Sequence, residues 1–97
     1  MSKLTEAARG QNCLIRIPGI CSHNPEQTVL AHIRMPGITG TSLKAVDLLG
    51  AFACDPCHSA VDGRLKTDFS HQELWTMHLE GMARTIDWLV KHGKVRA

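Results

Sequence analysis

The segment Cys54-Asp55-Pro56-Cys57-His58 carries the densest set of reactive side chains in this 97-residue sequence. Two cysteines with two residues between them are typical of half a zinc site or of a redox dithiol, and the histidine that follows adds a haem attachment site to the options. Two further cysteines decide between these interpretations. They flank a short segment that can turn back through Pro18-Gly19, so the four thiols form two pairs. We therefore predict a structural zinc (Zn²⁺) site made by Cys13, Cys21, Cys54 and Cys57.

The competing interpretations lack their usual context. Haem attachment and extracellular disulfides require export, and residues 1–10 hold no apolar stretch of the signal-peptide type. A thioredoxin-type dithiol requires a βαβ pattern, which the sequence does not predict. One thiol pair on an N-terminal turn and one opening a helix is the layout of a treble-clef-like site. The gap between Cys13 and Cys21 exceeds the usual spacing of about two to four residues, and His23 is an alternative zinc ligand.

Length and charge restrict the class of protein. A chain of 97 residues predicts one domain, residues 1–97, at the small end of the range where a metal commonly contributes to folding. The formal net charge of +2 does not by itself indicate nucleic-acid binding, but residues 27–46 contain no acidic side chain and include Arg34 and Lys44. No apolar run is long enough to cross a membrane, so we expect a soluble, cytoplasmic protein.

The first half of the sequence predicts a helix and two strands. Residues 3–9 form a short helix that ends before Gly10, and residues 13–21 form a hairpin with a turn. Residues 28–34 are rich in strand formers, and their period of two places Leu30, His32 and Arg34 on one face. Proline and glycine predict a loop over 36–42, and residues 48–53 form a second strand returning toward Cys54.

A helix follows the second strand. Asp55 is the expected cap, Pro56 suits the first helical position and Gly63 can end the helix. Within it His58 and Asp62 are four residues apart, so they share one face.

A longer helix is predicted from the capping box at residues 70–73 to about His92, before Gly93. Spacings of three and four predict a core-facing stripe of Trp75, Leu79, Met82, Ile86 and Leu89. The histidines of this helix, His71, His78 and His92, are expected at the surface.

A strand histidine, a returning strand and a helix bearing histidine and aspartate suit a one-metal phosphodiesterase. Phosphodiester hydrolysis requires a base that activates water and a divalent cation that neutralises charge on the phosphate and the leaving oxygen. We predict His32 as the base, because a neutral imidazole accepts a proton near pH 7. His58 and Asp62 offer one nitrogen and one oxygen to a cation such as Mg²⁺, which needs few protein ligands. Arg34 and Lys44 are candidates to hold the flanking phosphates of DNA.

Residues 31–33, 47–48 and 54–58 resemble the HNH endonuclease motif, the ββα-metal fold in its zinc-stapled form. Matching residues extend on either side, and together they resemble the small prophage nuclease family of YbcO over nearly the whole chain: Cys13, Arg16, Pro18-Gly19-Ile20-Cys21, Asn24-Pro25-Glu26, residues 29–34 and residues 80–85. The resemblance implies an α+β, zinc-stapled, HNH-like and treble-clef-like domain with a long C-terminal helix. It also implies a nuclease in a phage or prophage setting.

The sequence departs from the HNH pattern at three positions. Ala31 stands where many HNH enzymes carry an acidic or histidine metal ligand. Asp47 corresponds best to the central asparagine but lies farther from Cys54 than usual, so it is either a ligand or a residue that braces the loop. Asp62 stands where histidine or asparagine is common.

These residues lead to a ranked set of hypotheses. The first is a metal-dependent DNA endonuclease with His32 as general base and His58 and Asp62 holding the cation. The second is a non-catalytic zinc module that binds nucleic acid or a phage recombination or replication protein. A redox-sensing zinc switch is a third. Each side chain also has an ordinary structural interpretation, such as a half-buried strand position for His32, an exposed helix start for His58, or a surface ion pair of Asp62 with Arg64 or Lys66.

Overall fold

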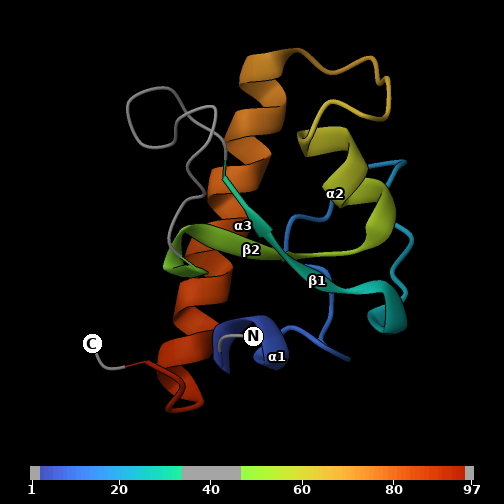
Figure 1. Cartoon of the computed structure of the whole chain (residues 1–97). Coiled ribbons are helices and arrows are strands. Elements are labelled where there is room, and N and C mark those ends of the chain that lie inside the picture. The colour runs from blue at the N-terminus through green and yellow to red at the C-terminus, as the bar shows by residue number, and fades with distance from the viewer. Residues whose placement is uncertain (1–2, 34–46, 96–97) are drawn as a thin grey trace.

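The computed structural model describes residues 3–33 and 47–95 of the chain, and within them it is a small α+β protein (Figure 1). Its elements in chain order are the helix α1 (Lys3–Ala7), a 3-10 turn at Pro25–Gln27, the strand β1 (Val29–His32), a 3-10 turn at Asp47–Leu49, the strand β2 (Gly50–Ala53) and the helices α2 (Asp55–Val61) and α3 (His71–Lys91). The predicted order of two strands followed by a helix is confirmed, and the loop predicted over residues 36–42 lies outside the described residues. No helix of the described residues is both long and apolar enough to cross a membrane.

The two strands form an antiparallel pair that presents the candidate residues at its ends. Val29 lies opposite Ala53, and His32 lies opposite Gly50. The chain therefore leaves β2 beside the start of β1 and enters α2 at once through Cys54, which is the N-cap of that helix. Asp55 was expected in this role, but it is already the first helical residue. The proline that follows favours the early helical position and leaves the cap to the residue before.

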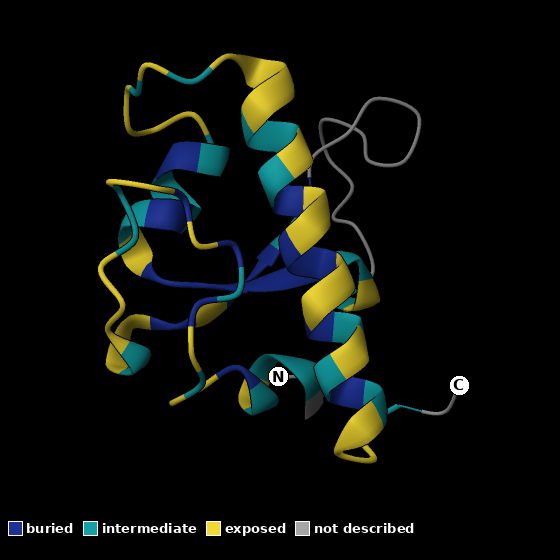
Figure 2. Ribbon diagram, turned by 180° about the vertical axis from the view of Figure 1, so that it is seen from behind, coloured by how far each residue is buried: buried dark blue, intermediate teal, exposed yellow. Residues whose placement is uncertain are grey.

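The long helix α3 packs across β2 and holds the sheet from one side (Figure 2). Its predicted capping box is confirmed, since the side chain of Ser70 accepts from the Glu73 amide and the Glu73 carboxylate accepts from the Ser70 amide. The helix ends as expected before Gly93, whose φ of +69° is the left-handed conformation that glycine adopts without strain.

The buried face of α3 is rotated from the predicted stripe. Of the predicted stripe, Met82 and Leu89 are buried as expected, Trp75 and Ile86 are only partly buried, and Leu79 is 43% exposed. The other buried residues of α3 are His78, Gly81 and Thr85. The reason is close packing. A Cβ at position 81 would lie 2.8 Å from Ile15 Cγ1, so the helix approaches Ile15 through a glycine, while His78 and Thr85 on the same face are buried with hydrogen bonds. The choice of buried face follows from the partners of the helix, which spacing alone does not reveal.

The segment between Cys13 and Cys21 turns as predicted but forms no strand within residues 13–21. Its turn is closed by the Cys21 amide, which donates to the Ile17 carbonyl at 3.0 Å. Its first arm is attached to β2, because the Leu14 amide donates to the Phe52 carbonyl at 2.7 Å. This attachment brings the N-terminal cysteine pair against the strand that leads to the second pair.

Candidate metal centre and active site

The four cysteines converge at one place in the core. One ligand sulfur from each lies within 4.8 Å of all the others, and no disulfide joins them. Three of the side chains are at most 5% exposed, and Cys21 lies at the margin of the same apolar cluster. The predicted convergence of Cys13, Cys21, Cys54 and Cys57 is confirmed, and the group is compact enough to hold a metal ion such as zinc.

Local structure explains how the two pairs meet. Cys54 caps α2 and Cys57 lies in its first turn, so both sulfurs point from the start of one helix. The turn before Cys21 brings Cys13 and Cys21 to the same place. The Sγ atoms of Cys21 and Cys54 are 3.8 Å apart, which matches the edge of about 3.8 Å that four Zn–S bonds of about 2.3 Å imply for a tetrahedron.

Contacts among the thiols change their pKa values. Hydrogen bonding from the Cys57 thiol lowers the pKa of Cys13 to about 4, and the same contact raises the pKa of Cys57. Burial raises the pKa of Cys21 to about 11. These contacts and burial favour the charged form of Cys13 and the neutral forms of Cys21 and Cys57. A bound divalent metal would replace the protons of the neutral thiols, as thiolate ligation requires.

His23, the alternative ligand, lies next to the cluster but outside it. Its Nδ1 is 3.7 Å from the sulfur of Cys21, and the compact ligand group consists of the four cysteines without it. Both His23 and Arg16 have positive φ angles, of 55° and 57°. Such angles are uncommon for residues other than glycine, and here they occur within three residues of a cluster cysteine.

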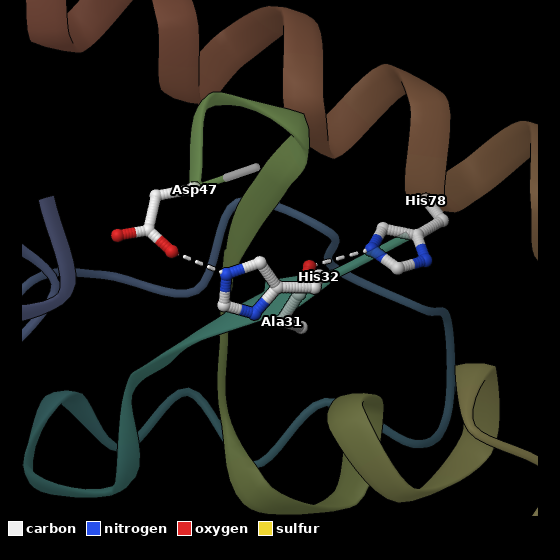
Figure 3. Close-up of polar contacts among 4 residues, drawn as sticks. All are labelled: Ala31, His32, Asp47 and His78. Carbon is white, nitrogen blue, oxygen red and sulfur yellow. Dashed lines mark hydrogen bonds and ion pairs between the residues drawn. The ribbon is translucent and has the colours of Figure 1, made fainter. Parts of the chain in front are cut away.

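His32 is held by Asp47 at the open end of the sheet (Figure 3). The His32 Nε2 lies 2.6 Å from Asp47 Oδ1, and the two side chains are 28% and 31% exposed. His32 is the last residue of β1, and Asp47 begins the turn that leads into β2. Asp47 was predicted to be either a metal ligand or a bracing residue. The contact favours bracing, because the carboxylate is bonded directly to the imidazole.

The second candidate pair lies on α2. His58 Nε2 and Asp62 Oδ2 are 3.3 Å apart, as expected for positions i and i+4. Asp62 is also 3.4 Å from Arg64, so the ion pair expected on structural grounds is present as well. The His58 side chain is 28% exposed and that of Asp62 is 11% exposed, which keeps both within reach of a small solvated ion.

His78 lies elsewhere than predicted. It was expected at the surface, yet it is only 3% exposed, and its Nε2 lies 2.8 Å from the Ala31 carbonyl oxygen (Figure 3). Burial lowers its pKa, and the hydrogen bond to the Ala31 carbonyl and the Asp62 carboxylate oppose that shift. The spacing 78, 82, 85 and 89 was the available signal for its burial. The other two helix histidines, His71 and His92, are exposed as predicted.

Two predicted phosphate contacts, Arg34 and Lys44, lie outside the described residues.

Comparison with known proteins gives consistent matches over nearly the whole chain. Residues 2–94 match the family described as "Putative nuclease YbcO". Two relatives carry the same description, one from Escherichia coli strain K12 and one from Enterobacteria phage 82; each is 46% identical over the full length of both chains. A solved structure described as "a putative bacteriophage protein" from Escherichia coli K-12 superposes with a TM-score of 0.77 at 42% identity, covering 92% of this chain and 98% of the other.

Proposed function

Because the chain belongs to the family described as "Putative nuclease YbcO", we propose that it is a metal-dependent endonuclease that hydrolyses phosphodiester bonds of DNA in a phage or prophage setting. The observation that carries the proposal is the bond between His32 and Asp47. A half-exposed imidazole fixed by a carboxylate is suited to act as a base toward water. A merely structural histidine needs no such orientation.

The contact with Asp47 sets the tautomer of His32. A carboxylate only accepts hydrogen bonds, so the proton between the two groups belongs to Nε2 of the ring. The lone pair of the neutral ring then lies on Nδ1. Among the residues that the structure describes, none bonds to this atom. In the proposed reaction Nδ1 takes a proton from the attacking water while Asp47 keeps the ring in place.

His58 and Asp62 are the proposed ligands of the catalytic cation. They present one nitrogen and one oxygen from the same face of α2, and Mg²⁺ commonly uses one or two protein ligands together with water and phosphate oxygens. When bound, the cation would neutralise charge on the scissile phosphate and the leaving oxygen. Asp62 would then exchange part of its contact with Arg64 for the metal.

We assign the order β1, β2 and α2 to the HNH-like, ββα-metal arrangement, stapled by structural zinc on the four cysteines. The spacing of the sulfurs and the positive φ angles of Arg16 and His23 support this assignment. Residues with positive φ cost of order 1–3 kcal/mol and persist where the surroundings require them. Arg34 and Lys44 remain the proposed contacts to phosphates on either side of the cleaved bond.

One observation favours a second function, a zinc module that binds nucleic acid or a phage protein without cleaving. Ala31 occupies the position before the base histidine, is fully buried and has no side-chain ligand atom. The cation would then depend on His58 and Asp62, which already bond to each other, and Asp62 also pairs with Arg64. This module would use the same zinc site and would bind DNA without turnover.

Cleavage of supercoiled plasmid in a panel of divalent ions separates the two functions. His32→Ala should lower turnover by roughly a hundredfold or more, the usual contribution of general acid–base catalysis, and leave zinc content and fold unchanged. His71→Ala is the matched control, because His71 is an exposed histidine at the first position of α3. If His32→Ala cleaves as fast as the parent protein, the endonuclease proposal is wrong and the binding module replaces it.

A further inference from the structure

His78 is a buried histidine that the proposed reaction does not use, and it is hydrogen-bonded to the residue before the proposed base. His78 is on the inner face of α3 and, at 3% exposure, is one of three buried polar residues among those described. Burying a polar ring is costly unless it is hydrogen-bonded. Its Nε2 satisfies this need by donating to the Ala31 carbonyl at 2.8 Å.

The bonded carbonyl belongs to the same peptide unit as the nitrogen of His32. A peptide unit is planar, so the oxygen of residue 31 and the Cα of residue 32 move as one rigid body. The bond from His78 therefore restrains the point from which the His32 side chain departs. Ala31 is fully buried and lies opposite Ala51 in the sheet, so its peptide is also held by strand pairing.

His32 is thus held at two places, from two different parts of the chain. Asp47 bonds the far end of the ring, and His78 bonds the backbone from which the ring projects (Figure 3). Burial lowers the pKa of His78, which favours the neutral ring. A neutral imidazole carries one N–H, and here the carbonyl acceptor places it on Nε2.

We propose that His78 is a positioning residue for His32: through the Ala31 carbonyl it fixes the imidazole that takes the proton from water. The inference rests on the proposed nuclease function. Misplacing a reacting group by about 1 Å can lower a rate by roughly a hundredfold. The expected effect is therefore on turnover, with DNA binding unchanged.

Three variants of the full-length protein test the inference. His78→Leu removes the donor and retains an apolar side chain, whereas His78→Gln retains an N–H that can reach the same carbonyl. Thr85→Val is the matched control. Thr85 is equally buried on the same face of α3, but its hydroxyl accepts from the Phe52 amide of β2, on the strand that does not carry His32.

Well below the unfolding midpoint, His78→Leu should lower kcat roughly tenfold to a hundredfold with KM for DNA unchanged. His78→Gln should restore most of that loss. Thr85→Val should lower the midpoint and leave kcat at the parent value. If His78→Leu and Thr85→Val both lower stability and neither changes kcat, His78 is only a core residue and the inference is overturned.

A second measurement keeps the inference separate from the proposed function. Long-range ¹H–¹⁵N spectra report the tautomer and ring environment of His32 whether or not DNA is cleaved. His78→Leu should disturb the His32 ring signals, and Thr85→Val should not. If the parent protein does not cleave DNA but this difference is present, the nuclease proposal fails and the positioning of His32 stands. Unchanged His32 signals in His78→Leu would overturn the positioning itself.

Discussion

The cysteine cluster and the histidine–aspartate group, made of His32, Asp47, His58 and Asp62, are buried to different degrees. The cysteine sulfurs are part of the apolar core, whereas His32, Asp47 and His58 are partly open to solvent. The change occurs within one step of the chain, since Cys57 is fully buried and its neighbour His58 is 28% exposed in its side chain. This difference supports the proposed division, in which the cysteines stabilise the fold through a metal and the partly exposed group takes part in catalysis.

The largest expected difference is between the effects of substituting Cys57 and of substituting its neighbour His58 on the stability of the fold. Cys57→Ser should unfold much of the chain, because a structural zinc site in a small domain contributes on the order of 10 kcal/mol and serine is a poor replacement for a thiolate. His58→Ala should leave the fold and zinc content intact and raise the cation concentration needed for DNA cleavage. Circular dichroism and elemental analysis on protein purified without chelator measure fold and zinc content, and plasmid cleavage over a range of divalent-cation concentrations measures the cation requirement.

A folded Cys57→Ser variant without metal would show that the core closes without zinc. Equal unfolding by His58→Ala would remove the distinction between the two groups. A parent protein that is folded and holds no zinc would contradict the structural role of the cysteines altogether.

Local sequence signals were sufficient for the cysteine cluster and for the element order. The spacing of two residues between Cys54 and Cys57, with proline between them, fixes a helix start and two ligands at once. The capping box at Ser70 and the glycines at 63 and 93 likewise mark helix ends by conformations that few other residues favour. These features depend on short stretches of chain, so one sequence is enough to predict them.

Features that depend on packing between distant segments were not predictable in the same way. The buried face of α3 was misassigned because the stripe through Leu79 and the stripe through His78 both fit helical spacing. The stripe through His78 is the buried one because Ile15 packs closely against Gly81 and because the Ala31 carbonyl accepts a hydrogen bond from His78. The bond of Asp47 to His32 has the same character, because it joins residues fifteen positions apart.

A smaller effect is expected from Asp47→Asn, which tests whether the histidine group works as a unit. An asparagine presents either an oxygen or an amide to the ring, so His32 can adopt the tautomer whose Nδ1 is protonated and no longer basic. Turnover should fall roughly tenfold or more, with the fold and zinc content unchanged. Asp87→Asn is the matched control, since Asp87 pairs with Lys91 on the exposed face of α3. Equal turnover in the parent and Asp47→Asn would show that the carboxylate does not orient the base.

The smallest effect is expected at Gly81, where α3 touches the loop of the first cysteine pair. An added Cβ would lie 2.8 Å from Ile15 Cγ1 and 3.1 Å from Ile15 Cα, so the loop backbone itself must shift. Overpacking costs about 1–3 kcal/mol, and the better helix propensity of alanine offsets about 1 kcal/mol. Gly81→Ala should therefore lower the unfolding free energy by about 1 kcal/mol, measured by urea denaturation.

The companion variant Ile15→Ala removes the closest atom, and a double-mutant cycle should show that Gly81→Ala costs less in that background. The backbone contact at 3.1 Å remains, so the relief should be partial. At temperatures below the unfolding midpoint, kcat of Gly81→Ala should equal that of the parent, because the tight contact is with Ile15, in the segment between Cys13 and Cys21. Gly81 is only one helical turn from His78, however. A loss of turnover in Gly81→Ala would mean that a displacement of α3 reaches the His32 peptide through His78. The geometry of the histidine–aspartate group would then depend on packing at the cysteine loop.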